Sequence, residues 1–537
     1  MDEGNPAAEA VAVADGRILA VGSRAEVEAL AGPGARRIDA GGKSVLPGFI
    51  ESHLHILLGA AELGHLQLFG VKGFDELSRK VRDFAAANPD KPVLQAQGAD
   101  YTILSETEPV TRHHLDRILP DRPFAMSSPD HHTMWANTKA LEMAGVTRDT
   151  PDPIPRFSYY ARDEKGEPTG YVLEVNAVLA LVNAVEPITA ANLGKLLDRW
   201  LPKAAAAGIT SLFDAGVPPI GSDQGAVINI YVDAEKRDAL PFRVSASYSV
   251  KSLPIDDVVE QFKDVRSRVS SELVHVDIVK IVGDGSQGGY TAWLIEPYAD
   301  MPNSIGASPF TEAQWHQLIG AVDAAGYDVH VHACGERTAR VALDGMEKAI
   351  ATNPKRDRRN AIAHLVYVED SDAPRFAKMN VTAQFSANWS SADPDTMINM
   401  LARYGQPRAS KLYRTKTILN QGGRVSFGTD WPAAGYFSTY KPLDSIEVGV
   451  TRRLIGKADA AVLVPADERL TVAEAIHANT MGAAYQLRMD DRIGSLEVGK
   501  FADLIVLDRN ILEGDPRDIH KAKVELTMMN GKIRHKA

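Results

Sequence analysis

Short apolar segments alternate with helical segments along most of this chain, and this alternation limits its fold more than any other feature. Parallel strands need long crossover connections, which helices usually supply. The helical segments include 312–325 and 472–480. The apolar segments that we interpret as strands are 47–55, 93–96, 124–127, 209–214, 242–246, 276–281, 327–332, 361–364, 381–385 and 424–430. The pattern predicts an α/β fold of the TIM-like (β/α)8 barrel type, and because there are more than eight segments, at least one belongs to an insertion.

The two chain ends carry shorter strand patterns. Asp15-Gly16 separates two apolar runs near the N-terminus, and Asn530-Gly531 lies within the last strand pattern, which follows another at 502–508. Such dipeptides favour hairpins. We expect both ends to pair into one small β-sandwich, with two unrelated hairpins as the alternative. The predicted domains are residues 1–46 and 488–537 for the sandwich and residues 47–487 for the barrel.

Composition limits the classes of partner. The chain has 537 residues, 45% of them hydrophobic, and a formal net charge of −11. An acidic chain is a poor ligand for nucleic acid or for an anionic membrane, so we expect neither and favour a small neutral or cationic substrate. A single cysteine, Cys334, excludes an intrachain disulfide. With no long apolar run and no signal-peptide pattern at the first residues, we expect a cytoplasmic protein, although a leader removed earlier would leave no trace.

The segment from Pro47 to His55 contains the first candidate metal ligands. It begins as a buried strand and ends in Ser52-His53-Leu54-His55. Side chains two residues apart on a strand share a face, so His53 and His55 would point into one pocket. By itself this pair is a weak signal, because histidines are often held by ordinary hydrogen bonds.

Four more residues that can bind metal end other predicted strands: Lys280, His332, His364 and Asp430. Each has a purely structural alternative, such as a core histidine, a turn cap or a lysine paired with Asp284. Side chains at the carboxyl ends of barrel strands converge on one pocket, however, so their joint occurrence there predicts a metal site. His330 shares the strand face of His332, and we assign it a supporting role because only His332 precedes an Ala-x-Gly sequence.

These motifs resemble the amidohydrolase superfamily, and within it the branch that includes the N-substituted formamide deformylases. The similarity extends in order over nearly the whole chain. It consists of residues 47–55, Asp130-His131-His132 with Trp135, Gly166–Gly170 with Glu174, Val279-Lys280-Ile281, His332–Glu336, Ala363-His364, Gly428–Pro432 and 494–504. The sequence departs from the family pattern at Glu336, where an aspartate is common, and by lacking a first N-terminal strand.

The resemblance implies a metal centre and a mechanism. Lys280 would react with carbon dioxide, and its carbamate would bridge two divalent ions. His53, His55 and Asp430 would hold one ion, and His332 and His364 the other; zinc suits these ligands best, with manganese, iron or cobalt as alternatives. Asp430 would take a proton from the metal-activated water and pass it to the leaving nitrogen. His132 would donate to the developing oxyanion, or would instead form a structural hydrogen bond to Asp130.

The substrate site is the least defined part. Its candidates follow strand ends or lie in nearby loops: Asp130, Trp135, Glu174, Tyr290, Trp293, Trp389 and Trp431, with Tyr298, Tyr436 and Phe437 as further aromatic candidates. They suggest an aromatic-lined pocket for an apolar or aromatic group, although such residues more often belong to the core.

We therefore predict a metal-dependent hydrolase that cleaves a carbon–nitrogen bond in an amide, formamide or cyclic amide other than a peptide. Ester or carbamate hydrolysis and deamination are alternatives on the same fold. A mononuclear deaminase would not need Lys280, which argues against deamination. A non-catalytic metal-binding or regulatory protein is the third alternative, and the presence of a candidate base argues against it. At the level of the family, the resemblance also implies a homodimer.

Overall fold

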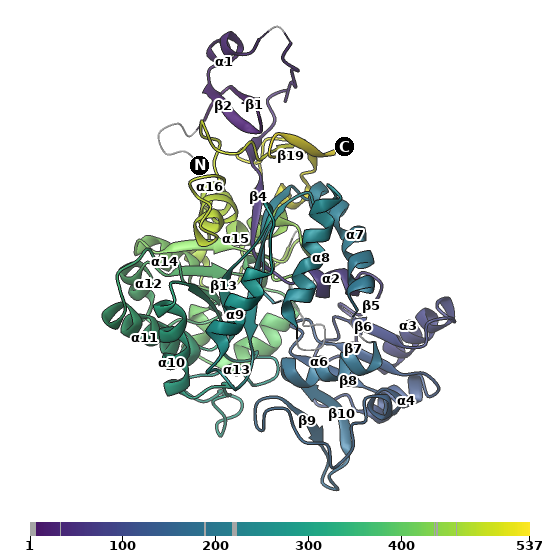
Figure 1. The fold of residues 1–537 in the computed structure, drawn as a ribbon. Coiled ribbons are helices and arrows are strands. Elements are labelled where there is room, and N and C mark those ends of the chain that lie inside the picture. Colours follow the sequence, from purple (N-terminus) through teal and green to yellow (C-terminus); the bar gives the residue numbers. More distant parts are fainter. Residues whose placement is uncertain are drawn as a thin grey trace.

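The computed structural model describes residues 7–32, 34–186, 189–216, 223–433, 435–436, 439–457 and 459–537. Its centre is a sheet of eight parallel strands in the order β17-β16-β15-β14-β13-β12-β11-β4 (Figure 1). The strands are β4 (Phe49–Leu54), β11 (Ile209–Asp214), β12 (Arg243–Val250), β13 (Val274–Val282), β14 (Asp328–Ala333), β15 (Ala361–His364), β16 (Thr382–Phe385) and β17 (Arg424–Phe427). The predicted TIM-like barrel is confirmed.

The sheet closes between its two outer strands. Just beyond β17, the Asp430 N–H donates to the His53 carbonyl at 2.8 Å, and the His55 N–H donates to the Trp431 carbonyl at 2.8 Å. Gly428 permits this approach, because a Cβ at that position would lie 2.4 Å from the backbone nitrogen of His53. The closure therefore brings the end of β17 directly against the end of β4.

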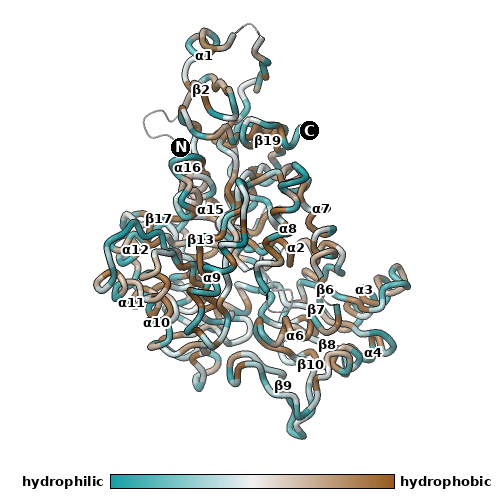
Figure 2. The backbone as a smooth tube through the Cα atoms, viewed as in Figure 1, coloured by the Kyte–Doolittle hydropathy of each residue, from teal (hydrophilic) through white to brown (hydrophobic). Residues whose placement is uncertain are grey.

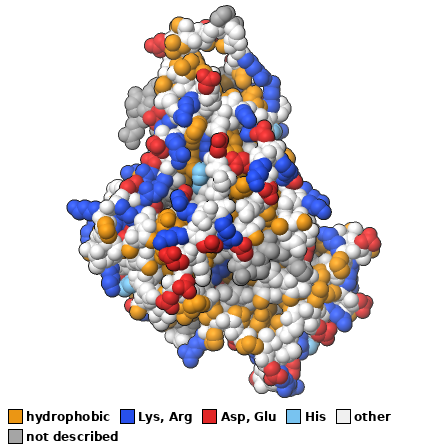
Figure 3. All heavy atoms as spheres, in the orientation of Figure 1, with side chains coloured by type: hydrophobic (Ala, Val, Ile, Leu, Met, Phe, Trp, Pro, Cys, Tyr) orange, Lys and Arg blue, Asp and Glu red, His pale blue; other side chains and the backbone are white. Residues whose placement is uncertain are grey.

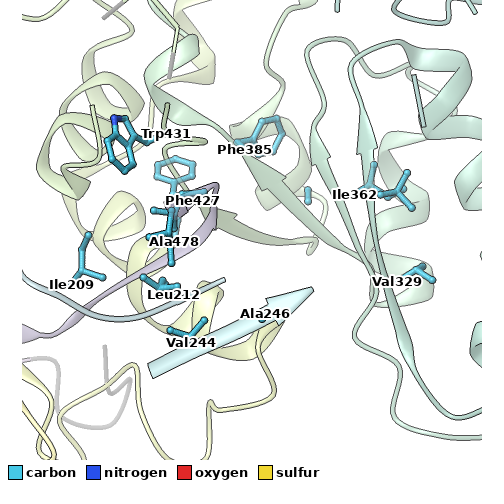
Figure 4. Close-up of a cluster of buried hydrophobic side chains, with 14 of the residues drawn as sticks. Ile209, Leu212, Val244, Ala246, Val329, Ile362, Phe385, Phe427, Trp431 and Ala478 are labelled. Atoms are coloured by element: carbon cyan, nitrogen blue, oxygen red, sulfur yellow. The ribbon is translucent and has the colours of Figure 1, made fainter. Parts of the chain in front are cut away.

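Helices surround the barrel and cover its apolar side chains. The helices outside the insertion are α1 (Arg24–Leu30), α2 (Ile56–Glu62), α7 (Ala190–Ala206), α8 (Gln224–Lys236), α9 (Val258–Ser267), α10 (Glu312–Ala324), α11 (Glu336–Thr352), α12 (Ala373–Met379), α13 (Leu401–Tyr404), α14 (Thr415–Asn420), α15 (Pro442–Thr451), α16 (Val472–His477) and α17 (Ala483–Gln486). Figure 4 shows part of the largest buried cluster, with Leu212, Ile362 and Phe427 on strands and Trp431 beyond β17. Hydrophobic segments run along the central strands in Figure 2, as expected for strands buried on both faces.

An insertion interrupts the barrel between α2 and α7. Its sheet has the strand order β5-β6-β7-β8-β10-β9 and lies beside the barrel in Figure 1. The elements are β5 (Leu66–Gln67), α3 (Phe74–Ala87), β6 (Leu94–Gln97), α4 (Arg112–Ile118), β7 (Phe124–Ser127), β8 (Thr133–Ala136), α5 (Thr138–Met143), β9 (Tyr159–Arg162), β10 (Pro168–Leu173) and α6 (Glu174–Val185). The predicted strands at 93–96 and 124–127 are therefore insertion strands, and the other eight build the barrel.

The two chain ends meet in two small sheets. The strands β1 (Ala10–Ala14) and β2 (Arg17–Gly22) form a hairpin, whose turn residue Asp15 has a φ of 50°. The second sheet has the order β20-β19-β18-β3. Its strands are β3 (Val45–Pro47), β18 (Leu504–Leu507), β19 (Val524–Met529) and β20 (Lys532–Lys536). Val11 and Val13 pack against Leu504, Val506 and Leu526 across the two sheets. The ends thus join as expected, while their description as one β-sandwich stays a prediction.

The surface in Figure 3 mixes Lys and Arg with Asp and Glu over the whole face shown. Of the helices that the structure describes, none is long and apolar enough by itself to cross a membrane; one bent pair, α6 with α7, meets the criteria of length and composition alone.

We expect Gly428→Ala to destabilise the fold by about 1 to 3 kcal/mol, because the new methyl group would clash with the backbone of β4 at the closure. Gly320→Ala is the matched control, since a Cβ there meets nothing within 4 Å and the residue lies inside α10. The control should be neutral or gain about 0.5 to 1 kcal/mol. Thermal unfolding followed by calorimetry would compare the two; equal midpoints would contradict the proposed role of Gly428.

Candidate metal centre and adjoining cavity

The structure brings the six predicted ligands together at the carboxyl end of the barrel. His53 lies on β4 and His55 follows it, Lys280, His332 and His364 lie on β13, β14 and β15, and Asp430 follows β17. All of these positions except His55 are nearly inaccessible to solvent. These six side chains lie close together because neighbouring parallel strands end on the same side of the barrel.

Asp430 lies at the centre of the cluster. Its Oδ1 is 3.4 Å from His53 Nε2 and 3.3 Å from His55 Nε2, and its Oδ2 is 3.6 Å from His364 Nδ1. Lys280 Nζ lies 3.1 Å from His53 Nε2. One carboxylate therefore contacts three imidazoles from two different strands.

His332 extends the cluster toward the insertion. Its ring centre is 4.4 Å from that of His364 and 5.1 Å from that of His132. Its Nε2 lies 3.3 Å from the Gly285 carbonyl oxygen and 3.6 Å from Asp284 Oδ1. His332 thus joins the candidate ligands on one side to the insertion residue His132 on the other.

Two buried polar atoms of this cluster, Asp430 Oδ1 and His364 Nε2, form no hydrogen bond among the described residues, although Asp430 Oδ1 lies within ion-pair distance of His53 and His55. A buried polar atom without a partner costs free energy and calls for an explanation. One atom each from His53, His364 and Asp430 lie within 4.8 Å of one another. Nitrogen and carboxylate oxygen donors at such spacing suit zinc and related divalent ions, so the residues fit a metal ion.

The electrostatics of the cluster favour neutral ligands. Burial, together with the charges of Lys280 and neighbouring histidines, holds the pKa of His53 and of His364 well below the ordinary range. Burial lowers the pKa of Lys280 to about 7, although Asp430 opposes this shift. Neutral imidazole is the form that binds metal, and a lysine with so low a pKa has a substantial uncharged fraction near neutral pH.

Backbone strain is concentrated at the same place. His364 has a φ of 75° and Asp430 a φ of 60°, in the left-handed region that residues other than glycine seldom adopt. Glu174, which contacts His132, has a φ of 66°. Such strain persists where the surrounding structure enforces it, and it is frequent at functional sites.

Residues behind the ligands hold two of the imidazole rings. His53 Nδ1 lies 2.9 Å from His330 Nε2, and His55 Nδ1 lies 3.3 Å from the Gly216 carbonyl oxygen. These contacts leave the Nε2 atoms of both rings facing Asp430. Contacts of this kind usually fix the tautomer and orientation of metal-binding histidines.

His132 pairs with Glu174, the first residue of α6, within the insertion. Its Nδ1 lies 2.7 Å from Glu174 Oε2, whereas its contact with Asp130 is made by the backbone N–H, 3.2 Å from Oδ1. Burial alone would lower the pKa of His132, but the carboxylates of Glu174 and Asp130 raise it to about 9. The ring is therefore a cation at neutral pH, and it is Glu174 rather than Asp130 that orients it.

A cavity adjoins the cluster. Three predicted residues line it, Asp130, His132 and Trp389, and Trp389 stacks on His364 with ring centres 5.0 Å apart. Tyr436 also lines it, while Phe437 lies outside the described residues. Our sequence reasoning missed the other lining residues: Tyr101, Pro129, Ser286, Gln287, Gly288, Cys334, Asp393, Asp395, Thr396, Met400, Tyr413 and Gly435. Of these, only the Asp-x-Asp sequence at 393–395 offered a recognisable signal.

The remaining predicted substrate residues do not line this cavity in the part of the chain that the structure describes. Trp135 packs between Tyr101 and Tyr171, and Trp431 stacks on Trp200. Trp135 and Trp431 are each 3% exposed. These rings fill apolar space, as large aromatic side chains usually do.

Two further aromatic candidates lie against arginines. The Tyr290 ring is 4.4 Å from the Arg403 guanidinium carbon, and the Trp293 ring is 4.6 Å from that of Arg337. Tyr298 is buried in a separate apolar cluster. All three aromatic residues follow strand ends in the sequence, and this position alone could not show whether they pack against the protein or contact a substrate.

Comparison with known proteins identifies the family to which this chain belongs. The amidohydrolase family pattern matches residues 36–535, and the chain belongs to that family. It is 30% identical to Protein LONG AFTER FAR-RED 3 of Arabidopsis thaliana, over 99% of this chain and 89% of the relative. It is 26% identical to the N-substituted formamide deformylase of Arthrobacter pascens, over 100% and 96%. An uncharacterized metal-dependent hydrolase of Pyrococcus horikoshii OT3 has the same fold, with a TM-score of 0.71, 23% identity and 94% of each chain covered.

The pair of His132 and Glu174 should make stability depend on pH. A pKa raised from the unfolded value of about 6.5 to about 9 means that the stabilisation is fully present below pH 6.5, is still large at pH 6.5, and is lost as the pH rises through 9. We expect His132→Gln to lower the thermal unfolding midpoint at pH 6.5 by roughly 2 to 5 °C, with the difference from wild type shrinking toward pH 10.

His113→Gln is the control for this pH dependence, because the side chain of His113 is 74% exposed. It should leave the unfolding midpoint near the wild-type value at every pH. A deficit of His132→Gln that stays constant between pH 6.5 and pH 10 would contradict the raised pKa.

Proposed function

We propose that this protein is a metal-dependent hydrolase that cleaves a carbon–nitrogen bond in an amide, formamide or cyclic amide other than a peptide. The observation that carries the proposal is the cluster around Asp430, in which buried donor atoms without hydrogen-bond partners converge at the mouth of a barrel. Similarity to an N-substituted formamide deformylase over the full chain supports the bond type.

In this proposal two divalent ions occupy the cluster. His53, His55 and Asp430 would hold one ion and His332 and His364 the other, and zinc suits these donors best. Lys280 would bridge them as a carbamate. Its uncharged amine can add to carbon dioxide, and its burial against His53 places it inside the cluster. When bound, such ions would lower the pKa of a water molecule and polarise the substrate carbonyl.

The side chains of the protein would handle the protons. Asp430 would accept the proton of the attacking water and deliver it to the leaving nitrogen. The His132 imidazolium uses Nδ1 for Glu174, which leaves its Nε2–H to donate to the developing oxyanion from the cavity wall. Trp389, stacked on His364, would shield the centre from bulk water.

Asp430→Asn tests the assigned base. It preserves the shape of the side chain but removes its basicity, so we expect kcat to fall by about 100-fold to 10,000-fold while most of the metal is retained. Turnover of a formamide panel and elemental analysis of the same preparation would measure both quantities. Asp277→Asn, on the outer side of β13 and paired with Arg266, should have near-normal activity. Near-normal turnover of Asp430→Asn would rule out this mechanism.

Lys280→Ala tests the carbamate. We expect about two divalent ions per wild-type chain and a large loss of metal in the variant. Formate, acetate or propionate should restore part of the metal and part of the activity, because a small carboxylate can replace the bridging oxygens. Lys236→Ala, whose side chain is 68% exposed on α8, should keep its metal and show no response to the acids. Full metal occupancy of Lys280→Ala without added acid would refute the bridge.

A further inference from the structure

Acidic side chains outnumber basic ones in the walls of the cavity beside the candidate metal centre. Three aspartates line it, Asp130, Asp393 and Asp395. Among its described lining residues there is neither a lysine nor an arginine. The one lining group that carries positive charge is His132, which is already paired with Glu174.

The three carboxylates are held by neutral groups. Asp130 accepts from the hydroxyl groups of Tyr101 and Ser128, Asp393 accepts from Ser391 and Thr396, and Asp395 accepts from Asn399 Nδ2 at 2.6 Å. Within the described parts of the chain, none of the three forms a salt bridge with a lysine or an arginine.

Some other buried carboxylates of this protein are neutralised by arginine. Asp323 pairs with both Arg356 and Arg358, and Asp503 pairs with Arg243. Buried charges usually require such partners. Asp393 and Asp395 have no such partner among the described residues; they resemble the buried Asp214 and Asp284, which are also held by neutral groups, but they line a cavity that a cation could enter.

One arginine, Arg403, contacts residues of the cavity wall without lining the cavity itself. The Arg403 guanidinium carbon is 6.0 Å from the Tyr101 ring centre, and its Nη2 donates to the Gly288 carbonyl at 3.0 Å. Burial raises the pKa of Asp395 to about 7, and the carboxylates of Asp393 and Asp100 add to the rise. Like-charge repulsion of this kind would be relieved by a cation in the cavity.

Aromatic rings complete the walls. Trp389, Tyr413 and Tyr436 line the same cavity as the aspartates. The Trp389 indole N–H donates to the Ala433 carbonyl at 2.8 Å, which fixes the ring in place. Aromatic faces attract organic cations, and the attraction is larger away from water. Carboxylates and fixed rings in one cavity are complementary to a protonated amine.

We propose that the substrate of this hydrolase carries a protonated amine, which binds in this cavity against Asp395, Trp389 and Tyr436 while the scissile bond lies at Asp430. This inference rests on the proposed function and adds the charge class of the substrate. Asp395 is then a specificity-determining residue, and it takes no part in the chemical step.

Three formamides of similar size and different charge test the proposal on the metal-loaded wild-type protein. They are N-[2-(dimethylamino)ethyl]formamide, which is cationic, N-(3-methylbutyl)formamide, its neutral isostere, and N-formyl-β-alanine, which is anionic. We expect kcat/KM for the cation to exceed that for the neutral isostere by about 10-fold to 100-fold, with the anion poorest. A neutral compound that is cleaved as well as the cation would overturn the proposal.

Asp395→Asn tests the assigned residue. The substitution should lower the ratio of kcat/KM for the cation to kcat/KM for the neutral isostere by about 10-fold or more. Asp491→Asn, whose side chain is 77% exposed, is the matched control and should keep the wild-type preference. An unchanged preference in Asp395→Asn would overturn the role of this residue, and if the variant does not fold, the wild-type ratios still decide the charge class.

Calorimetric titration with protonated N,N-dimethylbutylamine separates this inference from the proposed function. The amine has no scissile bond, and we expect it to bind wild type at least about 10-fold more tightly than Asp395→Asn. Turnover of amides without any charge preference would refute the inference alone. Absence of turnover for every amide would refute the proposed function, and the titration would then still decide whether the cavity binds an amine.

Discussion

The contact between the first and last barrel strands is the constraint on which the site depends. Backbone hydrogen bonds join Asp430 to His53 and His55 to Trp431, and Gly428 allows the two strands to approach closely. Because the strands are parallel, this closure puts residues separated by almost four hundred positions on one rim. The unusual φ values of His364 and Asp430 show that the backbone at the rim is held by its surroundings rather than by local preference.

Burial sets the chemistry of the rim. Most of the cluster is buried, so the imidazoles of His53, His332 and His364 stay uncharged and Lys280 loses much of its usual affinity for a proton. The same burial leaves Asp430 Oδ1 and His364 Nε2 without hydrogen-bond partners among the described residues. A site of this kind is costly for the fold until something occupies it, and divalent ions are the ligands that its donors suit. Charge is arranged differently a short distance away, where His132 and Glu174 form a buried ion pair, while Asp393 and Asp395 have no salt bridge among the described residues.

Sequence reasoning succeeded where periodicity and position determine contact. Alternation along a strand puts His53 and His55 together, and the rule that parallel strands end on one side gathers Lys280, His332 and the other candidates. Sequence reasoning could not tell which aromatic residues line the cavity and which belong to the core, because a tryptophan after a strand end can pack in either place. Trp389 lines the cavity, whereas Trp135 and Trp431 fill apolar space.

The sequence by itself determined the class of fold, the hairpins of the chain ends, the family and the candidate ligand residues, because each depends on local pattern or on motif order. Tertiary structure alone decided which predicted strands belong to the insertion and that Glu174, rather than Asp130, orients His132. It also decided that Asp395, the second aspartate of the Asp-x-Asp sequence, faces the cavity. These features depend on which surfaces the insertion and the barrel loops present to one another, and such long-range packing is not encoded in any short stretch of sequence.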